Sequence, residues 1–405
     1  MSSINWEQRD FAQVAVVDEL LARIKSVDAK EYGGRYVSGG RNILHINVLQ
    51  NKGTFLGLSD QHNVRLHFVR YSYQQLIDSQ EIVDSLIGKL SLQESMIDIV
   101  NNKIVIGITN DHPEVRAEIL HELNKLIENR EDMFVFQKVR PFTEASWMSE
   151  MMMNEDDIIE DDESHLKAAI TPQMKPGEWL GMKDMKGKVY ACRSLSFGVY
   201  MGGKPFYVTA GHKWKKKDIG KTIYYTANSS STNEYVSDTT DYAALKAVGD
   251  GKKSKAIGKV YGRKCDGQYD FCSISRSAGD VSTTAYNNYK LKYIGGEPEV
   301  GETVRFTGIA NRNRKGGGSS TYTTCLSVNK SYISLDGTKI KNGISVEGHG
   351  IIGTSGGPLM YMVGKDVAIA GIASYPDDVN NRVYFTKVDP LFSKYKLTPR
   401  NLIKI

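Results

Sequence analysis

The stretch GIIGTSGGPLMYM, from Gly350 to Met362, places a serine among glycines near the C-terminal end of the chain. Glycine clusters usually mark turns, and a serine within such a cluster is usually part of the turn. The same surroundings also suit a nucleophile. A glycine at position 353 lets a backbone N–H face a developing oxyanion, and Gly356 and Gly357 permit a tight chain reversal behind the hydroxyl. The stretch alone therefore leaves Ser355 as either a turn residue or a nucleophile.

A second short motif lies upstream and carries a histidine. The apolar run FYVTAGHKW, residues 206–214, ends in a turn of small residues that contains His212. A serine that becomes acylated needs a base, a group that orients the base, and hydrogen-bond donors for the oxyanion. A single histidine at a strand end is most often only packed there, but TAGH followed by G-x-S-G-G-P combines two independent motifs. We therefore interpret His212 as the general base and Ser355 as the nucleophile, with the N–H groups of Gly353 and Ser355 as the oxyanion hole.

The carboxylate that orients the base has two candidates. Asp241 lies in TDYAAL, 29 residues after His212, whereas Asp270 lies in YDFCSI, 58 residues after His212 and 85 before Ser355. The chemistry requires an acid that is buried beside the imidazole on a strand with apolar neighbours. Asp270 has aromatic residues on both sides. The chain between it and Ser355 is long enough for the end of its own strand and for most of a further β-barrel. We therefore favour Asp270 over Asp241.

The composition indicates a soluble globular protein of two or three domains. The chain has 405 residues, of which 40% are hydrophobic and 24% are charged. No apolar run approaches the roughly 18 residues that a membrane-spanning helix needs, so we expect no membrane span. The N-terminus also lacks the apolar region of a signal peptide. This leaves open whether export is absent, follows a non-classical route, or used a signal that has been removed.

Charge is distributed unevenly along the chain. Residues 1–175 carry 28 acidic and 18 basic side chains, and the remainder carries 34 basic and 19 acidic side chains. Two parts of opposite charge should attract each other, with salt screening the exposed portion. The lysines of the basic part are scattered through β-type sequence without a nucleic-acid-binding motif. We therefore predict a solvated surface and no nucleic-acid partner.

The patterning divides the chain into three parts. Residues 1–142 have the alternation of an α+β domain, residues 143–184 form an acidic linker, and residues 185–405 form an all-β domain. Seven of the nine positions from Glu155 to Glu163 are acidic, which is typical of an exposed, mobile linker. Many short strands at near-regular spacing with almost no helix predict a β-barrel or sandwich for the last part. In the first part the expected helices are 5–30, 73–90 and 112–129, and the expected strands are 42–50, 63–72, 132–139 and a hairpin over 95–109 that turns at Asn101-Asn102.

Metal and cofactor motifs are absent from the sequence. The four cysteines, Cys192, Cys265, Cys272 and Cys325, lack the paired spacing of a zinc site. They allow two disulfides in the C-terminal half or, about equally, buried thiols. There is no H-E-x-x-H segment, and the glycine run RNRKGGGSS at 312–320 lacks the ending of a phosphate-binding loop. We expect neither a metal nor an organic cofactor.

The segments VTAGH (208–212), YDF (269–271) and GTSGGPL (353–359), in this order, resemble those of the chymotrypsin-like serine peptidases. The nearest branch is the bacterial streptogrisin and α-lytic protease group. Further segments of the β part are similar to opening, barrel-entering and substrate-binding strands of that group. These segments are CRSLSFGVY (192–200), EVGETVRFTGIANRN (299–313) and AIAGIASY (368–375).

The resemblance implies a multi-domain chain with a C-terminal trypsin-like double β-barrel, in which two six-stranded antiparallel barrels flank the active site. It places Ser374 next to the catalytic aspartate and pairs the backbone of Ser374, Tyr375 and Pro376 with the substrate. The implied enzyme is a secreted, extracellular serine endopeptidase that hydrolyses protein or peptide substrates through an acyl-enzyme on Ser355.

The N-terminal part resembles the pro-regions of the same peptidases. The segments YGGRYVSGGRNILHINV (32–48) and MIDIVNNKIVIGI (96–108) are similar to their paired strands. The resemblance implies an α+β pro-domain over residues 1–142 that assists folding and blocks the cleft until it is removed, with processing in the linker 143–184. The chain would then be a zymogen and its own N-terminal region a partner.

Two alternatives keep the fold but change the function. The N-terminal region could be a permanent regulatory or targeting domain, or the chain could be an inactive homologue that serves as a binding module. The binding-module alternative is opposed by the complete catalytic set, because a non-catalytic descendant has no chemical reason to keep all four residues. They are His212, Asp270, Ser355 and Gly353.

Some residues depart from the family pattern. Thr354 stands where the family usually has an aspartate, and Lys213 stands where it has a cysteine, so Cys192 loses its familiar partner. His349, in the segment before Gly353, lines the specificity pocket or occupies a surface loop. The disulfide pattern and the primary specificity therefore stay open.

Overall fold

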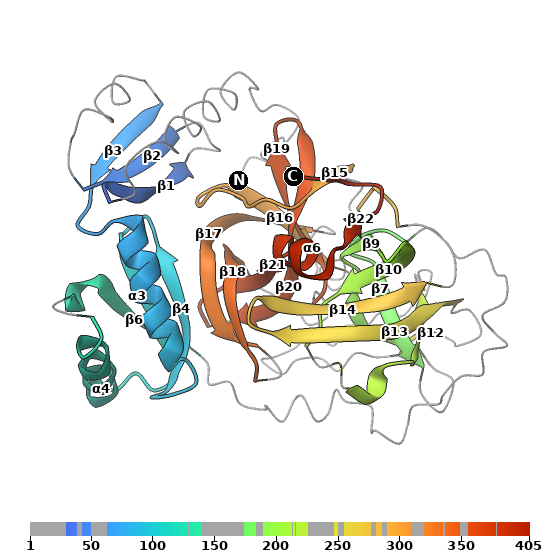
Figure 1. Ribbon diagram of the computed structural model, residues 1–405, viewed down its shortest axis with the longest axis horizontal. Helices are drawn as coiled ribbons and strands as arrows, with labels where there is room; N and C mark the ends of the chain where they lie inside the picture. The colour runs from blue at the N-terminus through green and yellow to red at the C-terminus, as the bar shows by residue number, and fades with distance from the viewer. Residues whose placement is uncertain are drawn as a thin grey trace.

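The computed structural model describes most of the chain except its N-terminus, the acidic linker and several loops. The described residues are 30–38, 43–49, 63–127, 130–139, 174–183, 189–212, 214, 216–225, 247–249, 255–276, 281–285, 290–308, 320–334, 337–348, 355–377 and 379–405. Within them the architecture is mostly β, with few helices (Figure 1). The helix predicted over 5–30 and the acidic block at 155–163 lie outside the described residues.

The described residues of the N-terminal region, 30–139, contain one three-stranded sheet, three strands of a larger sheet and two α-helices. Its elements are β1 (Tyr32–Ser38), β2 (Ile43–Val48), β3 (Val64–Phe68), α3 (Tyr73–Leu86), β4 (Leu92–Asp98), β5 (Lys103–Ile108), α4 (Pro113–Asn124), the short 3-10 helix η2 (Glu131–Met133) and β6 (Phe134–Lys138). Strands β1 and β2 are antiparallel, whereas β2–β3 and β5–β6 are parallel. The helices and strands predicted from residue 43 onward are present. Both helices end four or five residues earlier than predicted.

Local sequence explains where these helices begin. The Gln75 N–H donates to Ser72 Oγ at 3.1 Å and the Ser72 N–H donates to Gln75 Oε1 at 2.9 Å, which is a capping box ahead of α3. Helix α3 then buries Leu76 and Val83 on one face. Pro113 opens α4, because the first turn of a helix has no use for the N–H that proline lacks.

In the C-terminal region, residues 174–405, one sheet runs in the order β12-β8-β7-β11-β13-β14-β10-β9-β22. Its strands are β7 (Trp179–Lys183), β8 (Val189–Ser194), β9 (Phe197–Met201), β10 (Lys204–Thr209), β11 (Thr222–Tyr225), β12 (Ala247–Gly249), β13 (Lys255–Asp266), β14 (Tyr269–Arg276) and β22 (Thr398–Pro399). Strands β8 and β9 are consecutive in the chain and separate at Leu195-Ser196.

A second sheet runs in the order β16-β19-β20-β21-β18-β17 and continues into β4-β5-β6 of the N-terminal region. Its C-terminal strands are β15 (Leu291–Ile294), β16 (Thr303–Thr307), β17 (Ser320–Ile333), β18 (Lys339–Glu347), β19 (Pro358–Val363), β20 (Asp366–Asp377), β21 (Arg382–Lys387) and β23 (Ile403–Lys404). Helix α6 (Asp389–Tyr395) follows β21 and was not predicted, because seven residues are too few for a clear helical period. The two-barrel arrangement that the resemblance implies stays a prediction.

Strand pairing joins the two regions directly. In Figure 1 the blue elements of the N-terminal region stand beside the orange strand β17, and β4 pairs antiparallel with it from Tyr332↔Glu94 to Lys330↔Met96. A second contact comes from β1, where the Val37 N–H donates to Val300 O at 2.8 Å. The pairing of β4 with β17 makes β4, β5 and β6 an extension of the C-terminal sheet, whereas β1, β2 and β3 form a separate sheet.

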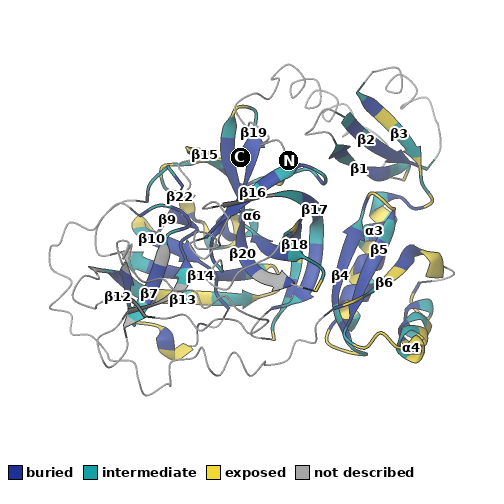
Figure 2. Cartoon of the chain, turned by 180° about the vertical axis from the view of Figure 1, so that it is seen from behind, coloured by how far each residue is buried: buried dark blue, intermediate teal, exposed yellow. Residues whose placement is uncertain are grey.

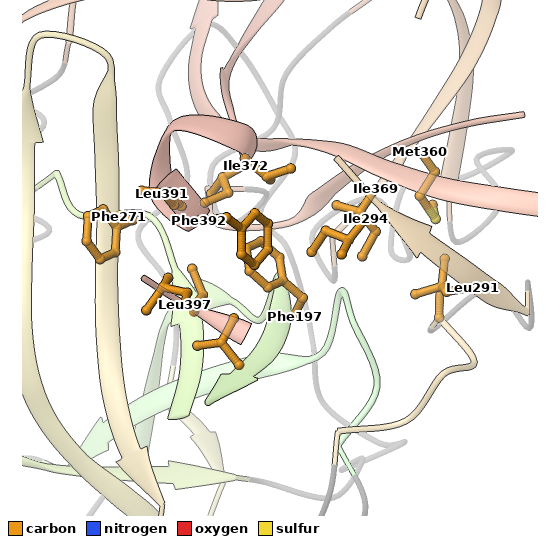
Figure 3. Close-up of a cluster of buried hydrophobic side chains, with 14 of the residues drawn as sticks. Phe197, Phe271, Leu291, Ile294, Met360, Ile369, Ile372, Leu391, Phe392 and Leu397 are labelled. Carbon is orange, nitrogen blue, oxygen red and sulfur yellow. The ribbon is translucent and has the colours of Figure 1, made fainter. Parts of the chain in front are cut away.

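Hydrophobic side chains fill the space between the two C-terminal sheets. Figure 2 shows their strands as largely buried, in contrast to the exposed outer side of α4. One cluster joins strands of the first sheet to strands β19 and β20 of the second sheet and to helix α6 (Figure 3). Its labelled members are Phe197, Phe271, Leu291, Ile294, Met360, Ile369, Ile372, Leu391, Phe392 and Leu397. The cluster fixes β14, which carries Asp270, against β20, which carries Ser374.

The described cysteines form no disulfide bond. Cys265, Cys272 and Cys325 all carry thiols, so the alternative with two bridges is wrong. Burial raises the pKa of the Cys325 thiol well above its usual value, which keeps it protonated and unreactive. In the part of the chain that the structure describes, no helix has the length and apolarity to cross a membrane.

Two histidines form a hydrogen-bonded row on the polar face of the β1–β3 sheet. His45 Nδ1 lies 2.8 Å from His67 Nε2, and Ser38 Oγ lies 2.8 Å from His45 Nε2. Burial, and after it His67 and Arg65, lower the pKa of His45. Since the folded sheet disfavours protonation of this group, its stabilising contribution is complete above the pKa of an unfolded histidine, about 6.5, and declines as the pH falls below that value.

We therefore expect acid to loosen this sheet selectively. Hydrogen-exchange protection of the β1–β3 amides should fall between about pH 7.5 and about pH 5.5, while that of β19–β21 is retained. His45→Gln should weaken the dependence, because it removes the titrating group. An equal decline in both sheets would contradict this assignment.

Candidate active site

His212 lies in the turn that follows β10. The turn approaches β13 and β14 so closely that a Cβ on Gly211 would stand 2.4 Å from Phe271 O and 2.7 Å from Lys264 O. Only glycine fits at that position. The imidazole that follows it is completely buried.

Asp270 is the second residue of β14, the strand that pairs with β10. Its Oδ1 accepts hydrogen bonds from the backbone N–H groups of Gly211 at 2.8 Å and of His212 at 2.7 Å. Its Oδ2 lies 2.6 Å from His212 Nδ1 and also accepts the hydroxyl of Ser374. The carboxylate therefore orients both the main chain and the ring of the histidine.

The electrostatic environment keeps this acid ionised. Complete burial by itself would raise the pKa of Asp270, but the charge and hydrogen bonds of His212 together with the Ser374 hydroxyl lower it to about 2. An ionised carboxylate on Nδ1 stabilises the tautomer whose Nδ1 carries the proton. Nε2 of His212 is then free to act as a base toward its other neighbour.

That neighbour is Ser355, whose Oγ lies 3.1 Å from His212 Nε2. The chain turns sharply after the serine, and Gly356 has a φ of +88°. A Cβ on Gly356 would lie 2.1 Å from Thr209 Oγ1 and 2.4 Å from Ser194 O, so a side chain is excluded for steric as well as conformational reasons. The glycine after the serine thus allows the nucleophile loop to pack against the end of β10.

Ser374 belongs to β20, the strand expected to contact substrate. Strand β19 pairs with β20 as far as Pro358↔Ile372, and the Gly356 N–H donates to Ala373 O at 2.8 Å. Beyond that point β20 pairs with β21 on its other side, with Tyr375↔Tyr384 and Pro376↔Val383 in register. The backbone from Ser374 onward therefore continues past the nucleophile loop.

Several residues singled out from the sequence lie outside the described part of the chain. They are Lys213, Asp241, His349, Gly353 and Thr354. The Gly353 half of the proposed oxyanion hole, the alternative acid at 241 and the role of His349 stay predictions. Of the two candidate acids, Asp270 is the one that the structure places on the imidazole.

Arg193 makes a further contact with the site that no sequence motif predicted. Its Nη2 donates to the carbonyl oxygen of His212 at 2.5 Å, and its guanidinium lies 5.9 Å from the centre of the Trp214 ring. Arginines occur at many strand ends, so residue type alone carries no signal here. Position 213, beside His212, is a lysine where the resembled peptidases usually have a cysteine, and this was the one hint in the sequence.

The arrangement supports proton transfer from a hydroxyl to an imidazole that a buried carboxylate holds in place. This is the geometry of an activated serine, which attacks acyl carbons. Among the described residues, no three histidine, cysteine, aspartate or glutamate side chains are grouped as metal ligands.

Comparison with known proteins gives structural matches only. No protein-family model and no curated protein matches the chain. Solved structures that it resembles include bacterial chymotrypsin-like serine proteases. Thermobifida fusca protease A is 19% identical, with a TM-score of 0.38 over 56% of this chain and 98% of that one. Cellulomonas bogoriensis chymotrypsin is 18% identical, with a TM-score of 0.38 over 57% of this chain and 100% of that one.

Proposed function

We propose that the protein is a serine endopeptidase and that it is made as a zymogen. The observation that carries this proposal is the continuous hydrogen-bonded series from Ser374 through Asp270 and His212 to Ser355. Ser355 Oγ attacks the peptide carbonyl while His212 Nε2 takes its proton. His212 then gives that proton to the leaving amine, which leaves an acyl ester on Ser355. Water, deprotonated by His212, hydrolyses the ester and restores the serine.

An extended peptide is the substrate that fits the surroundings of Ser355. Strand β20 runs from the nucleophile loop through Ser374 to Asp377 and has β21 on one side. A peptide aligned along the other side of residues 374–376 would gain main-chain hydrogen bonds, as in other cases of strand addition. This supports protein or peptide substrates and the pairing roles of Tyr375 and Pro376.

The docking of the N-terminal region supports the zymogen proposal. Strand β6 ends beside the turn after β20, where Asn380 Nδ2 donates to Lys138 O at 3.2 Å and Arg382 Nη1 donates to Gln137 Oε1 at 3.0 Å. The last described residues of the N-terminal region therefore lie next to the proposed substrate strand. We infer that this region competes with substrate until it is removed.

Self-cleavage tests both parts of the proposal. Purified full-length protein should cut itself after about residue 142 and before β7 (Trp179–Lys183), in the part of the predicted linker that precedes the C-terminal sheet. Ser355→Ala protein prepared in parallel should stay intact. Cleavage of both proteins at equal rates would point to a contaminating protease, and an uncut wild type that nevertheless hydrolyses added substrate would favour a permanent N-terminal domain.

Activity should also rise continuously with pH through the acid range. Because the pKa of Asp270 is lowered to about 2, this acid stays ionised, and the loss of activity on acidification reports the imidazole. The rate should rise with pH through a single step near about 6.5 to 7 and then level off. A profile that is flat between about pH 5 and about pH 8 would contradict a histidine base.

A further inference from the structure

Two adjacent residues at the end of β8 contact both partners of the His212–Ser355 hydrogen bond. Arg193 Nη2 donates to the carbonyl oxygen of His212 at 2.5 Å. The Ser194 N–H donates to the carbonyl oxygen of Ser355 at 2.8 Å. The main chains of the base and of the nucleophile are therefore attached to the same short piece of strand.

The remaining polar groups of the histidine turn are fixed by other neighbours. Asp270 accepts the N–H groups of Gly211 and His212, and the indole of Trp214 donates to Ala210 O at 3.0 Å. The His212 carbonyl accepts a hydrogen bond from Arg193. Loss of the arginine would remove this charged donor.

Trp214 in turn restrains the arginine. The indole is almost entirely buried, and the guanidinium lies over its ring at 5.9 Å from the centre. A flat, charged guanidinium can stack on an aromatic ring and donate a hydrogen bond from its edge at the same time. Because residue 213 is a lysine and not a cysteine, no disulfide can be formed next to His212. The hydrogen bond from Arg193 to the His212 carbonyl, which is non-covalent, connects the turn to β8.

We propose that Arg193 is a positioning residue for the catalytic base, which it holds so that His212 Nε2 stays 3.1 Å from Ser355 Oγ. Hydrogen bonds from a charged donor are the stronger ones, so a single bond of this kind can restrain a carbonyl. The proposal rests on the proposed function, since it assigns Arg193 to the proton transfer between these two atoms. Misplacing reacting groups by 1 Å costs about 10²-fold in rate, which sets the expected effect.

The test compares Arg193→Met, Arg193→Lys and wild type. Methionine keeps much of the volume and removes the donor, whereas lysine keeps a charged donor but loses the flat fork. Each full-length chain is processed in trans by a tagged wild-type enzyme, which is then removed. Two rates are measured, the phosphonylation of Ser355 by a fluorophosphonate and the hydrolysis of a fluorescently labelled unfolded protein. Arg263→Met, which removes an exposed arginine from β13 in the same sheet, is the matched control.

For Arg193→Met we expect phosphonylation and kcat to fall by about 10- to 100-fold, with KM changed by less than about threefold. Arg193→Lys should recover part of the loss, and Arg263→Met should match wild type. A general loss of structure would not separate kcat from KM or rank lysine above methionine. Should the methionine variant fold poorly, Arg193→Gln, a shorter neutral donor, takes its place and should fall below lysine.

Two results would overturn the assignment: a neutral variant (methionine, or glutamine in its place) that reacts within threefold of wild type, or lysine and neutral variants that lose activity equally through KM. Reactivity of wild-type Ser355 tests the proposed function separately. The ratio of variant to wild type tests Arg193, so the two failures are distinguishable.

Discussion

Ser355→Ala should lower kcat/KM for an unfolded protein substrate by about 10⁴- to 10⁶-fold, to the level left by binding and oxyanion stabilisation. Of the two hydroxyls in the series, that of Ser355 lies 3.1 Å from the base His212 Nε2, whereas that of Ser374 donates to Asp270, so Ser355 is the one expected to form the acyl ester. Since an inactive chain would also fail to process itself, both proteins are first cut by an immobilised glutamate-specific protease. The acidic block Glu155–Glu163 supplies its sites.

The controls separate the nucleophile from serines in general. Ser393→Ala removes an exposed hydroxyl from α6 and should leave kcat/KM unchanged. His212→Ala should be as inactive as Ser355→Ala, and the double variant should be no worse, because the two groups act as one unit. A Ser355→Ala protein that keeps more than a small fraction of activity would remove Ser355 from the mechanism.

Glu94→Ala should release the N-terminal region, with a loss of about 3–5 kcal/mol in the stability of its attachment. Glu94 Oε1 lies 2.5 Å from Lys330 Nζ, and the two side chains are 4% and 0% exposed. Glu94 also accepts the hydroxyl of Tyr384 at 2.8 Å. Burial lowers the pKa of Lys330 and Glu94 raises it, so removal of the glutamate leaves an ammonium buried without its counter-charge.

Urea titration and hydrogen exchange across β4 and β17 measure this effect in the Ser355→Ala background, which prevents self-cleavage. The matched control is Lys292→Met, which breaks the exposed Lys292–Asp366 pair of 2.7 Å and should cost no more than about 1 kcal/mol. Replacing both partners, with Glu94→Gln and Lys330→Met, should restore most of the loss, because no charge then stays buried alone. Equal effects of Glu94→Ala and Lys292→Met would contradict the account of the docking surface.

Local sequence was enough to predict the parts of the site that lie in tight turns. Gly211 and Gly356 are required by close approaches, to Phe271 O and to Thr209 respectively, and such positions leave a visible glycine signature beside His212 and Ser355. Asp270 could be preferred to Asp241 because an acid flanked by aromatic residues on a strand is expected to be buried. The structure brings Asp270 to the imidazole.

Contacts between segments that are distant in the chain could not be predicted, because no local sequence pattern marks them. The pairing of β4 with β17 joins residues more than 200 positions apart, and either strand edge could have paired elsewhere. The same holds for Arg193, whose contact with His212 depends on how β8 ends relative to the histidine turn. Helix α6 was missed because it is too short for its period to be recognised.

Covalent labelling of Ser355 tests the central claim most directly. Processed wild-type protein treated with a fluorophosphonate should gain the mass of one phosphonyl group, and peptide mapping should place it on Ser355. His212→Ala and Asp270→Asn proteins should label far more slowly, by about 10⁴-fold for the latter, because the base is lost or held in the wrong tautomer. A wild-type protein that gains no adduct, or gains it on another serine while Ser355 stays unmodified, would contradict the account.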